Sequence, residues 1–554
     1  MCQARRVGWE LSRRRVLQGA GAIGLAGLVG CSGSDSKPGP TGRSRPRPAF
    51  PDGWDFPTAP DSEAPFCHGV ASGDPLADRV VVWTRLTWPE PPGDDVEVEW
   101  RVARDEDLGD PVAQGTVTTH ADRDWTVKVD VDGLEPGTTY HYGFTADGWD
   151  SPTGRTRTAP ALDGEGGIGL AVVSCSSYWS GWWNAYDRIA ARDDVDLVVH
   201  CGDHIYDDVD SAEWVRARDD RFEPDHVDFR AWRDLTEVRR RYALHYAEPS
   251  FLALHLAHPI TIAWDNHDVG GDVEDQPDVN RQAFWEWTPC RPADAEEDDG
   301  GNLVPADVRR DHRQLAYGDV DLFVLDLRTR SDDTTILGAE QRAWFERGLV
   351  DSVRRRRPWR LVVNPIPIAN VSLGGAGYGG WTDRPGDQAS LLQHLIDNGI
   401  DDCVFLSGDA HGAFVADLPP DQSPAGYDPA TGTGSAAVEI LANSVSRGGG
   451  DETVADGLYQ ERYGTSPDAD RERFEALLPE AQATTEGIEA ALLDANPALV
   501  YAQWRDHGYG IVRLTPDEAT LEQWFVPHLA PSSDETLGAR FTVARGSNHV
   551  VPAD

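Results

Sequence analysis

The sequence predicts two folded parts, a small all-β domain followed by a large α/β domain, and two observations lead to this prediction. Between residues 66 and 160, short segments alternate polar and apolar residues and are separated by Asp-Gly and Pro-Gly turns, which is typical of antiparallel strands. From residue 167 onward, near-continuous runs of Val, Ile and Leu alternate with helical stretches, which is typical of strands buried on both faces by helices.

The first 31 residues predict an export signal. Residues 12–17, SRRRVL, are similar to a twin-arginine motif, and the apolar stretch after them is too short for a stable membrane anchor. This stretch ends in LVGC at residues 28–31, which is similar to a lipobox and would make Cys31 the lipidated first residue of the mature protein. We therefore expect export by the twin-arginine translocase and a lipid-anchored protein outside the cytoplasm. The alternative is an N-terminal helix with a chance run of arginines.

Residues 32–60 are rich in Ser, Gly and Pro and predict a flexible linker. The small domain is expected over residues 61–162, as a sandwich similar to immunoglobulin or fibronectin domains. In it, Tyr140 follows a Pro-Gly turn, where a tyrosine hydroxyl can tie the sandwich together. Its expected strands are residues 79–86, 96–105, 114–120, 124–134 and 138–148.

The large domain is expected over residues 163–535. A helix is predicted at 185–193 and a hairpin at 509–526. The main strands are predicted around residues 167–175, 194–203, 259–265, 319–327, 359–367, 401–409 and 436–444.

The charge balance is strongly acidic. Fifty Lys and Arg against 94 Asp and Glu give a formal net charge of −44, and the only lysines are Lys37 and Lys128. Such a surface repels nucleic acid, so no nucleic-acid binding is expected. We expect a halophilic protein, whose hydrated carboxylates keep it soluble in concentrated salt; the alternative is a generic solvated surface.

The sequence has seven cysteines. Cys2 would be removed with the signal and Cys31 would carry the lipid, which leaves five, an odd number, so at least one is free or a ligand.

Polar side chains follow four of the predicted strands of the large domain, at the point where each strand ends. Ligands of open α/β sheets bind beyond the carboxyl ends of the strands, so these side chains are expected to meet at one rim. They are Cys175 after the first strand, Asp203 and Tyr206 after the second, Asp265, Asn266, His267 and Asp268 after the third, and Asp409 and His411 after the sixth.

Together with GVASGDPLADRVVVWTRL at residues 69–86, the segments VVSCSS, GDHIYDD, WDNHDVGGD and LSGDAHGA resemble the PhoD-type alkaline phosphatases and phosphodiesterases. These belong to the calcineurin-like metallophosphoesterase superfamily, which also includes the purple acid phosphatases. The resemblance covers about residues 66–530 and implies an α/β fold with a β-sandwich flanked by helices. It also implies an exported, metal-dependent phosphoric ester hydrolase with a dinuclear site and a metal-activated hydroxide.

The resemblance implies a role for each residue. Asp203 would bridge two cations, and Cys175, Tyr206 and His411 would complete a site for Fe³⁺, since thiolate and phenolate favour iron over calcium. Asn266 and Asp409 offer hard oxygens to a second cation, for which Ca²⁺ is expected. His267 would face the phosphate and stabilise charge or protonate the leaving oxygen. Alternatively, Cys175 is a plain core residue and Tyr206 packs under a loop.

Several neighbouring residues are left open. Asp265 is either a ligand or a partner that orients one. Arg328 either grips phosphate or forms a salt bridge in a loop. His204 and Asp207 are expected on the surface of a loop, and Asp272 stands where an Asn is common in the family.

The expected substrates are small-molecule or lipid phosphate esters. One alternative is a phosphodiesterase or phospholipase D-like activity on the same site. A further alternative is a non-catalytic, lipid-anchored binding protein.

Overall fold

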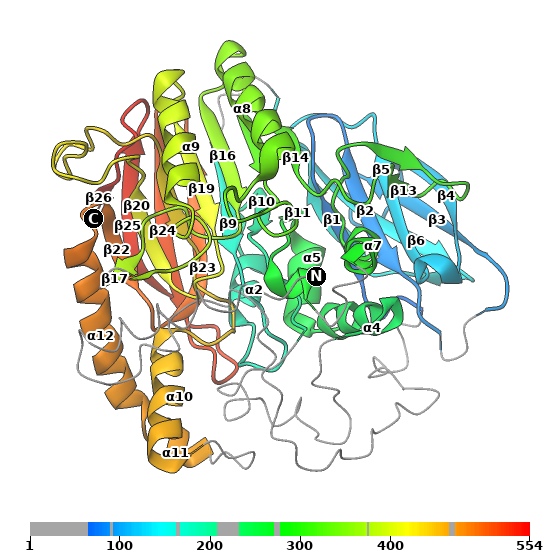
Figure 1. Ribbon diagram of the computed structural model, residues 1–554. Coiled ribbons are helices and arrows are strands. Elements are labelled where there is room, and N and C mark those ends of the chain that lie inside the picture. The colour runs from blue at the N-terminus through cyan, green and yellow to red at the C-terminus, as the bar shows by residue number, and fades with distance from the viewer. Residues whose placement is uncertain are drawn as a thin grey trace, which may run out of the picture.

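The computed structural model describes residues 65–88, 92–161, 167–207, 232–270, 277–373, 376–464 and 471–553. Two large sheets pack face to face and helices cover their outer faces (Figure 1). The predicted signal, its Cys31 and the linker at 32–60 lie outside the described residues.

The first large sheet has ten strands in the order β26-β25-β24-β23-β9-β10-β11-β1-β2-β5, and its centre, β9-β10-β11, is parallel. Buried Val, Ile and Leu residues on both faces make these central strands, as the apolar runs predicted. The bounds are β26 Val551–Ala553, β25 Thr536–Ala544, β24 Glu518–Val526, β23 His507–Leu514, β9 Ile168–Val173, β10 Leu197–His200, β11 Ile260–Ile262, β1 Val70–Gly73, β2 Val80–Arg85 and β5 Thr126–Val131.

The second large sheet has seven strands in the order β14-β15-β16-β19-β21-β20-β22, with β15, β16, β19 and β21 parallel. The bounds are β14 Arg313–Tyr317, β15 Val320–Val324, β16 Trp359–Asn364, β19 Cys403–Ser407, β21 Val438–Leu441, β20 Ala413–Asp417 and β22 Leu499–Gln503.

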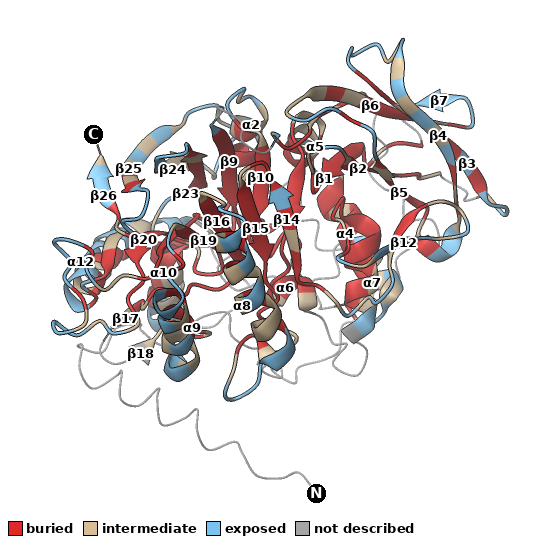
Figure 2. Cartoon of the chain, turned by 90° about the horizontal axis from the view of Figure 1, so that it is seen from above, coloured by how far each residue is buried: buried red, intermediate tan, exposed pale blue. Residues whose placement is uncertain are grey.

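Three cores separate the layers, and Figure 2 shows that the buried residues concentrate in the strands. Leu170 and Val199 of the first sheet pack with Val363 and Leu406 of the second in the core between the sheets. The outer face of the first sheet is covered by α2 Asn184–Ala190, α4 Leu235–Tyr246, α5 Pro249–Ala257 and α7 Pro277–Trp287. The outer face of the second is covered by α8 Gly338–Arg354 and α9 Pro385–Asp397. The expected β-sandwich flanked by helices is confirmed.

The small β domain shares a sheet with the large domain. Its own sheet contains β3 Val96–Ala103, β4 Pro111–Thr119, β6 Thr139–Ala146, β7 Trp149–Asp150 and β8 Gly154–Arg157, and it packs on β2 and β5. Strand β1 pairs with β11 in parallel at Gly73 and Ile260, so the second layer of the small sandwich continues into the ten-stranded sheet. The Tyr140 hydroxyl accepts a hydrogen bond of 2.9 Å from the backbone N–H of Glu135, as expected for the tyrosine corner.

The remaining elements lie at the edges. Helices α10 Gly450–Tyr463, α11 Arg471–Glu475 and α12 Leu478–Ala495 pack on one another around Leu458, Phe474 and Ala481. Short elements are η2 Ala121–Arg123, α6 Asn266–Val269 and the pairs β12 Ala295–Glu297 with β13 Leu303–Pro305 and β17 Ser372–Leu373 with β18 Ala376–Gly377. Among the described residues, no helix combines the length and apolar character needed to cross a membrane.

Candidate metal centre

The carboxyl ends of β9, β10, β11 and β19 converge, and the predicted residues follow them directly. The backbone joins the first two loops, because the Cys175 N–H donates to the Gly202 carbonyl at 3.2 Å and the Ser176 N–H to the Asp203 carbonyl at 3.0 Å. Asn266 and His267 begin the short helix α6 after β11, and Asp409 and His411 follow β19.

The backbone is strained at four of the predicted ligands. Cys175, Asp203, Asp409 and His411 have φ values of 58°, 53°, 64° and 52°, in the left-handed region that non-glycine residues avoid. Such conformations cost about 1–3 kcal/mol each and concentrate at functional sites. Gly202 directly precedes Asp203 and has a φ of 106°. A Cβ at Gly202 would lie only 2.5 Å from the Cβ of Asp265, so a larger residue does not fit there. The turns therefore carry four predicted ligands in backbone conformations that have an energetic cost.

The first group of side chains has the composition expected for the iron site. One ligand atom each of Cys175, Asp203 and His411 lies within 4.8 Å of the others. The Cys175 Sγ lies 3.9 Å from Oδ2 of Asp203, and the Tyr206 hydroxyl donates to this same oxygen at 3.3 Å. The Arg447 guanidinium lies 4.6 Å from the centre of the Tyr206 ring, where its charge favours a phenolate.

His411 is oriented for metal binding. Its Nδ1 lies 2.9 Å from the Gly448 carbonyl, so Nδ1 carries the proton, and its buried Nε2 has no hydrogen-bond partner among the described residues. Burial lowers the pKa of His411 to about 4, so the imidazole is neutral and able to bind a metal at neutral pH.

The second group collects oxygens around Arg328. This side chain donates to Oδ1 of Asp265, to Oδ1 of Asn266 at 3.0 Å and to Oδ1 of Asp409 at 2.6 Å. Arg328 thus forms salt bridges, as one of its two predicted roles requires, and it does so among the oxygens predicted for the second cation. The other oxygen of Asp265, Oδ2, is buried and has no hydrogen-bond partner in the described part of the chain.

The electrostatics of both groups favour bound cations. Burial raises the pKa of Asp203 to about 6, even though His267 lowers it, and burial raises the pKa of Asp265 well above its ordinary value. Burial also raises the pKa of the Cys175 thiol well above its usual range, and the neighbouring Asp203 raises it further. Cations would reverse these shifts by stabilising the thiolate and the carboxylates. The donor sets therefore fit one cation that prefers thiolate and phenolate and one that prefers oxygen.

His267 forms a pair that the sequence did not predict. Its backbone N–H donates to Oδ1 of Asp203 at 2.9 Å, and its Nδ1 lies 2.6 Å from Oδ1 of Asp207. The expectation that Asp207 and His204 lie on the surface is wrong, since both are buried. Asp207 fixes the ring so that Nδ1 carries the proton and Nε2 is the atom left to act on a ligand.

Asp268 holds the loops together and was also missed as a functional residue. Its Oδ2 accepts from the backbone N–H groups of Asp203 and Asp265, both at 2.8 Å, and its Oδ1 lies 2.8 Å from Nδ1 of His204. It stands at the predicted strand end, but its inward orientation depends on the helix α6 that begins there.

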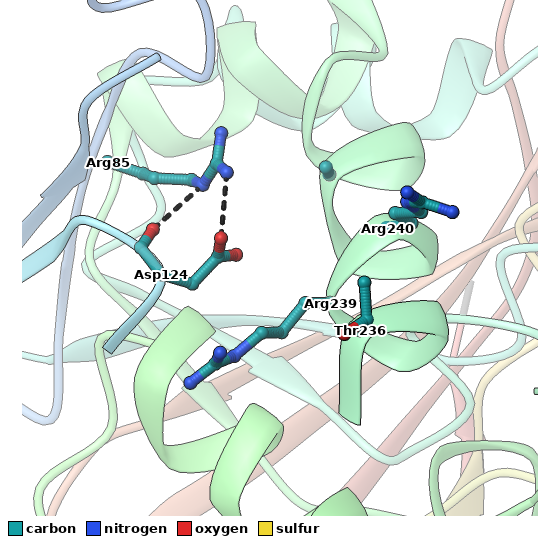
Figure 3. Close-up of a pocket in the computed structure, with 6 residues that line it drawn as sticks. Arg85, Asp124, Thr236, Arg239 and Arg240 are labelled. Atoms are coloured by element: carbon teal, nitrogen blue, oxygen red, sulfur yellow. Dashed lines mark hydrogen bonds and ion pairs between the residues drawn. The ribbon is translucent and has the colours of Figure 1, made fainter. Parts of the chain in front are cut away.

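A pocket of about 180 Å³ lies elsewhere, between the small β domain and α4 (Figure 3). Arg85, Arg239 and Arg240 line it. Arg85 is paired with Asp124 at 2.9 Å and Arg239 with Glu286 at 2.6 Å, so neither charge is available to an anion.

Asp272, which the sequence left open at the edge of the predicted site, lies outside the described residues.

Comparisons with known proteins agree with this geometry. Residues 170–523 match the sequence profile described as PhoD-like phosphatase, and residues 53–160 match the profile of the PhoD-like phosphatase N-terminal domain. Alkaline phosphatase D of Bacillus subtilis (strain 168) is 29% identical over 402 residues, which cover 64% of this chain and 66% of the relative's length.

Two solved structures are similar to the fold. A structure of PhoD has a TM-score of 0.71 and 24% identity, and the match covers 89% of this chain and 93% of that chain. The purple acid phosphatase PPD1 from yellow lupin (Lupinus luteus) seeds has a TM-score of 0.54 and 13% identity, and the match covers 87% of this chain and 75% of that chain.

Proposed function

Because the chain belongs to the PhoD-like phosphatase family, we propose that it is a metal-dependent phosphoric ester hydrolase of the alkaline phosphatase D type. The observation that carries the proposal is the convergence of Cys175, Asp203 and His411 within 4.8 Å, beside the oxygens of Asn266 and Asp409. These residues are far apart in the sequence and come from four strand ends.

We propose Fe³⁺ and Ca²⁺ as the two cations. Cys175, Tyr206 and His411 supply the soft and aromatic donors that iron prefers, Asn266 and Asp409 supply oxygens for calcium, and Asp203 would serve both. Bound there, the cations would polarise the phosphate and make a hydroxide nucleophile available near neutral pH.

The chain's own residues would orient the substrate and move protons. Asp207 holds the ring of His267 by a 2.6 Å contact, so His267 would present Nε2 to the ester and protonate or stabilise the leaving oxygen. Arg328 donates hydrogen bonds to Asn266 and Asp409. If these two side chains bind calcium instead, the guanidinium of Arg328 would become available to donate to the phosphate oxygens of the substrate.

Asp203→Ala tests the proposal. Hydrolysis of p-nitrophenyl phosphate and the content of both metals in the purified protein should fall to background. Asp278→Ala is the matched control, because this aspartate has a side chain that is 55% exposed and pairs with Arg281, which is not among the predicted ligands. Turnover retained in Asp203→Ala would falsify the assignment. A purple or reddish colour, lost in Tyr206→Phe, would support iron bound to a phenolate, whereas an active protein without iron would overturn that metal alone.

A diesterase or phospholipase D-like activity is the second candidate for the same centre, because two cations accept monoesters and diesters alike. Rates on p-nitrophenyl phosphate and on bis(p-nitrophenyl) phosphate decide between the two: a higher kcat/KM for the diester favours the second candidate. A protein that binds metal and hydrolyses neither ester would instead favour the non-catalytic binding protein.

We also propose that the protein is exported and lipid-anchored, on the grounds of the arginines at residues 13–15 and of Cys31. A Cys31→Ala variant should move from the membrane fraction to the medium, and replacing Arg13 and Arg14 by Lys should retain the protein in the cytoplasm. If the wild type and both variants were found in the same fraction, the proposed export and lipid anchoring would be contradicted.

A further inference from the structure

A second cluster of metal-ligating side chains lies outside the candidate metal centre. It consists of Glu452, His507 and His528, and one ligand atom of each lies within 4.8 Å of the others. Glu452 lies in the first turn of α10, His507 begins β23, and His528 follows β24. We propose that these three residues form a separate structural site for a divalent transition-metal ion, with Zn²⁺ as the preferred ion.

The distances within the cluster match a zinc site. Nε2 of His507 lies 3.3 Å and Nε2 of His528 lies 3.2 Å from one atom, Oε1 of Glu452. Zinc bonds of about 2.0–2.2 Å to nitrogen and oxygen place neighbouring ligand atoms of a tetrahedron about 3.3–3.5 Å apart. Two imidazoles and one carboxylate are also a donor set that zinc uses, whereas calcium and magnesium take oxygen ligands.

Each ligand is held in place by its surroundings. Oε2 of Glu452 accepts from the Gly449 N–H at 2.7 Å, which leaves Oε1 directed at the two imidazoles. The backbone around His528 is fixed, because its carbonyl accepts from the Trp182 N–H at 2.6 Å and the Pro527 carbonyl accepts from Asn184 at 2.6 Å. A site whose ligands are fixed before binding loses little conformational entropy when the metal arrives.

The burial of the cluster leaves one way in. The side chains of His507 and Glu452 are 1% and 4% exposed, while that of His528 is 12% exposed. A metal ion and the water that completes four-coordination would therefore enter past His528. The two imidazole rings lie 3.6 Å apart at their centres and are tilted by 34°, and each directs its Nε2 to the same carboxylate oxygen.

The position of the cluster indicates a structural role. The segment before α10 carries Gly448, whose carbonyl orients His411 at 2.9 Å, and Arg447, which lies over the Tyr206 ring. A metal on Glu452, His507 and His528 would tie the start of α10 to the β23–β24 hairpin and so fix this segment. The site is independent of the proposed catalytic chemistry, since none of its ligands belongs to the candidate metal centre.

The test is zinc stoichiometry in the full chain, measured by elemental analysis after equilibration with Zn²⁺ and removal of free metal. His528→Ala should hold one equivalent less than the wild type. His549→Ala is the matched control, because His549 also pairs with a buried carboxylate, Asp417, at 2.7 Å and is 17% exposed; it should keep the full amount. Cys175→Ala, which removes a ligand of the candidate metal centre, should keep this equivalent, so failure here and failure of the proposed function are distinguishable.

A second variant and a second measurement guard against misfolding. Glu452→Gln retains an oxygen for the Gly449 N–H but lacks the carboxylate, and it should also lose one equivalent. A chelator that binds zinc but leaves calcium and iron in place should lower the Tm of the wild type and of His549→Ala but not that of Glu452→Gln or His528→Ala. Equal zinc content in wild type, His528→Ala and Glu452→Gln, or the same chelator effect in all of them, would overturn the proposal.

Discussion

The pairing of His267 with Asp207 decides which nitrogen of the imidazole is available to the ester. Asp207 lies 2.6 Å from Nδ1, and both side chains are buried, so the pair is shielded from water. A carboxylate in this position fixes the tautomer and stabilises the imidazolium that forms when the ring takes up a proton.

The first prediction follows from this pair. Asp207→Asn should lower kcat about 10- to 100-fold, because an amide nitrogen can donate to Nδ1 and favour the wrong tautomer. Metal content should stay at the wild-type level, since Asp207 is not among the predicted ligands. The pH–rate profile should also change in the limb that reports the general acid. Asp193→Asn, at an exposed position, is the control. A variant with wild-type kcat and pH profile would show that Asp207 only packs there.

Arg328 carries the second prediction. It is the cation that pairs with Asp265 and Asp409 in the structure, and loss of one partner of a buried ion pair costs about 3–5 kcal/mol. Arg328→Ala should therefore lower the free energy of unfolding of the metal-free protein by about this amount. Added Ca²⁺ should restore most of the loss, because a second cation then neutralises the same carboxylates.

The measurement is thermal unfolding in chelator and in Ca²⁺. Arg330→Ala is the matched control, because Arg330 is exposed and donates a hydrogen bond of 2.8 Å to the Arg309 carbonyl rather than to a buried carboxylate. A loss of stability in Arg328→Ala that is the same with and without Ca²⁺ would argue that Arg328 and the cation do not share these oxygens.

The candidate site could be predicted only as far as strand ends can be located. The apolar runs end at Cys175, Asp203, Asn266 and Asp409, and the rule that strand ends meet at one rim brings them together. Asp207 was misplaced because the direction in which a loop turns is not encoded in local polarity. The cluster of Glu452, His507 and His528 has no spacing that a motif would detect, since its members meet only through the packing of α10 on a hairpin.

At the scale of elements, strands with long apolar runs were predictable and edge elements were not. The hairpin of β23 and β24 was predicted at 509–526 and is present, with His507 opposite Val526. The small domain was predicted as a separate sandwich, yet β1 pairs with β11 across 187 positions between Gly73 and Ile260. Periodicity reports which face of a strand is buried, but it does not report the strand's partner.

Lys128 lies where α7 packs on β5, and it carries the third prediction. Its Nζ donates to the Trp285 carbonyl and to the Cys290 carbonyl at 3.3 Å, and burial lowers its pKa from 10.5 to about 7. Between pH 7 and 10.5 the unfolded chain holds a proton at Lys128 that the folded chain has released. The free energy of unfolding from this group should therefore rise with pH in that window, by up to about 1.4 kcal/mol per pH unit.

Denaturant unfolding at several pH values measures this slope. Lys128→Met should lose the part of the slope that Lys128 contributes, and the comparison with wild type cancels the Tyr and Cys residues that titrate in the same range. Lys128→Arg should lose the slope too, but with lower stability at every pH, because the guanidinium stays charged in a buried position. An unchanged slope in both variants would show that Lys128 keeps its proton in the folded protein over this pH range.

At the scale of the whole molecule, the net charge of −44 is the dominant property. Arginines neutralise carboxylates locally, as in the pairs Arg192–Asp194 and Arg462–Glu480, but 94 acidic residues outnumber 50 basic ones. The excess repels itself more strongly in the compact state than in the expanded one, so it opposes folding in dilute buffer. Salt shortens the Debye length from about 10 Å at 0.1 M to about 3 Å at 1 M and removes most of this repulsion.

The fourth prediction is that KCl stabilises the protein. The Tm should rise between 0.1 M and 2 M KCl by at least the equivalent of about 1 kcal/mol, roughly 1–2 °C for a domain as large as the one over residues 163–535 at about 2.1 cal/mol/K of unfolding entropy per residue. Sorbitol at matched osmolality should give a smaller rise, because it is excluded from the surface without screening charge. The buried candidate centre is screened much less than the surface. The value of kcat per folded molecule should therefore change little over the same range of KCl. A Tm that is independent of KCl, or one that sorbitol raises as much, would mean that the acidic surface serves solubility alone.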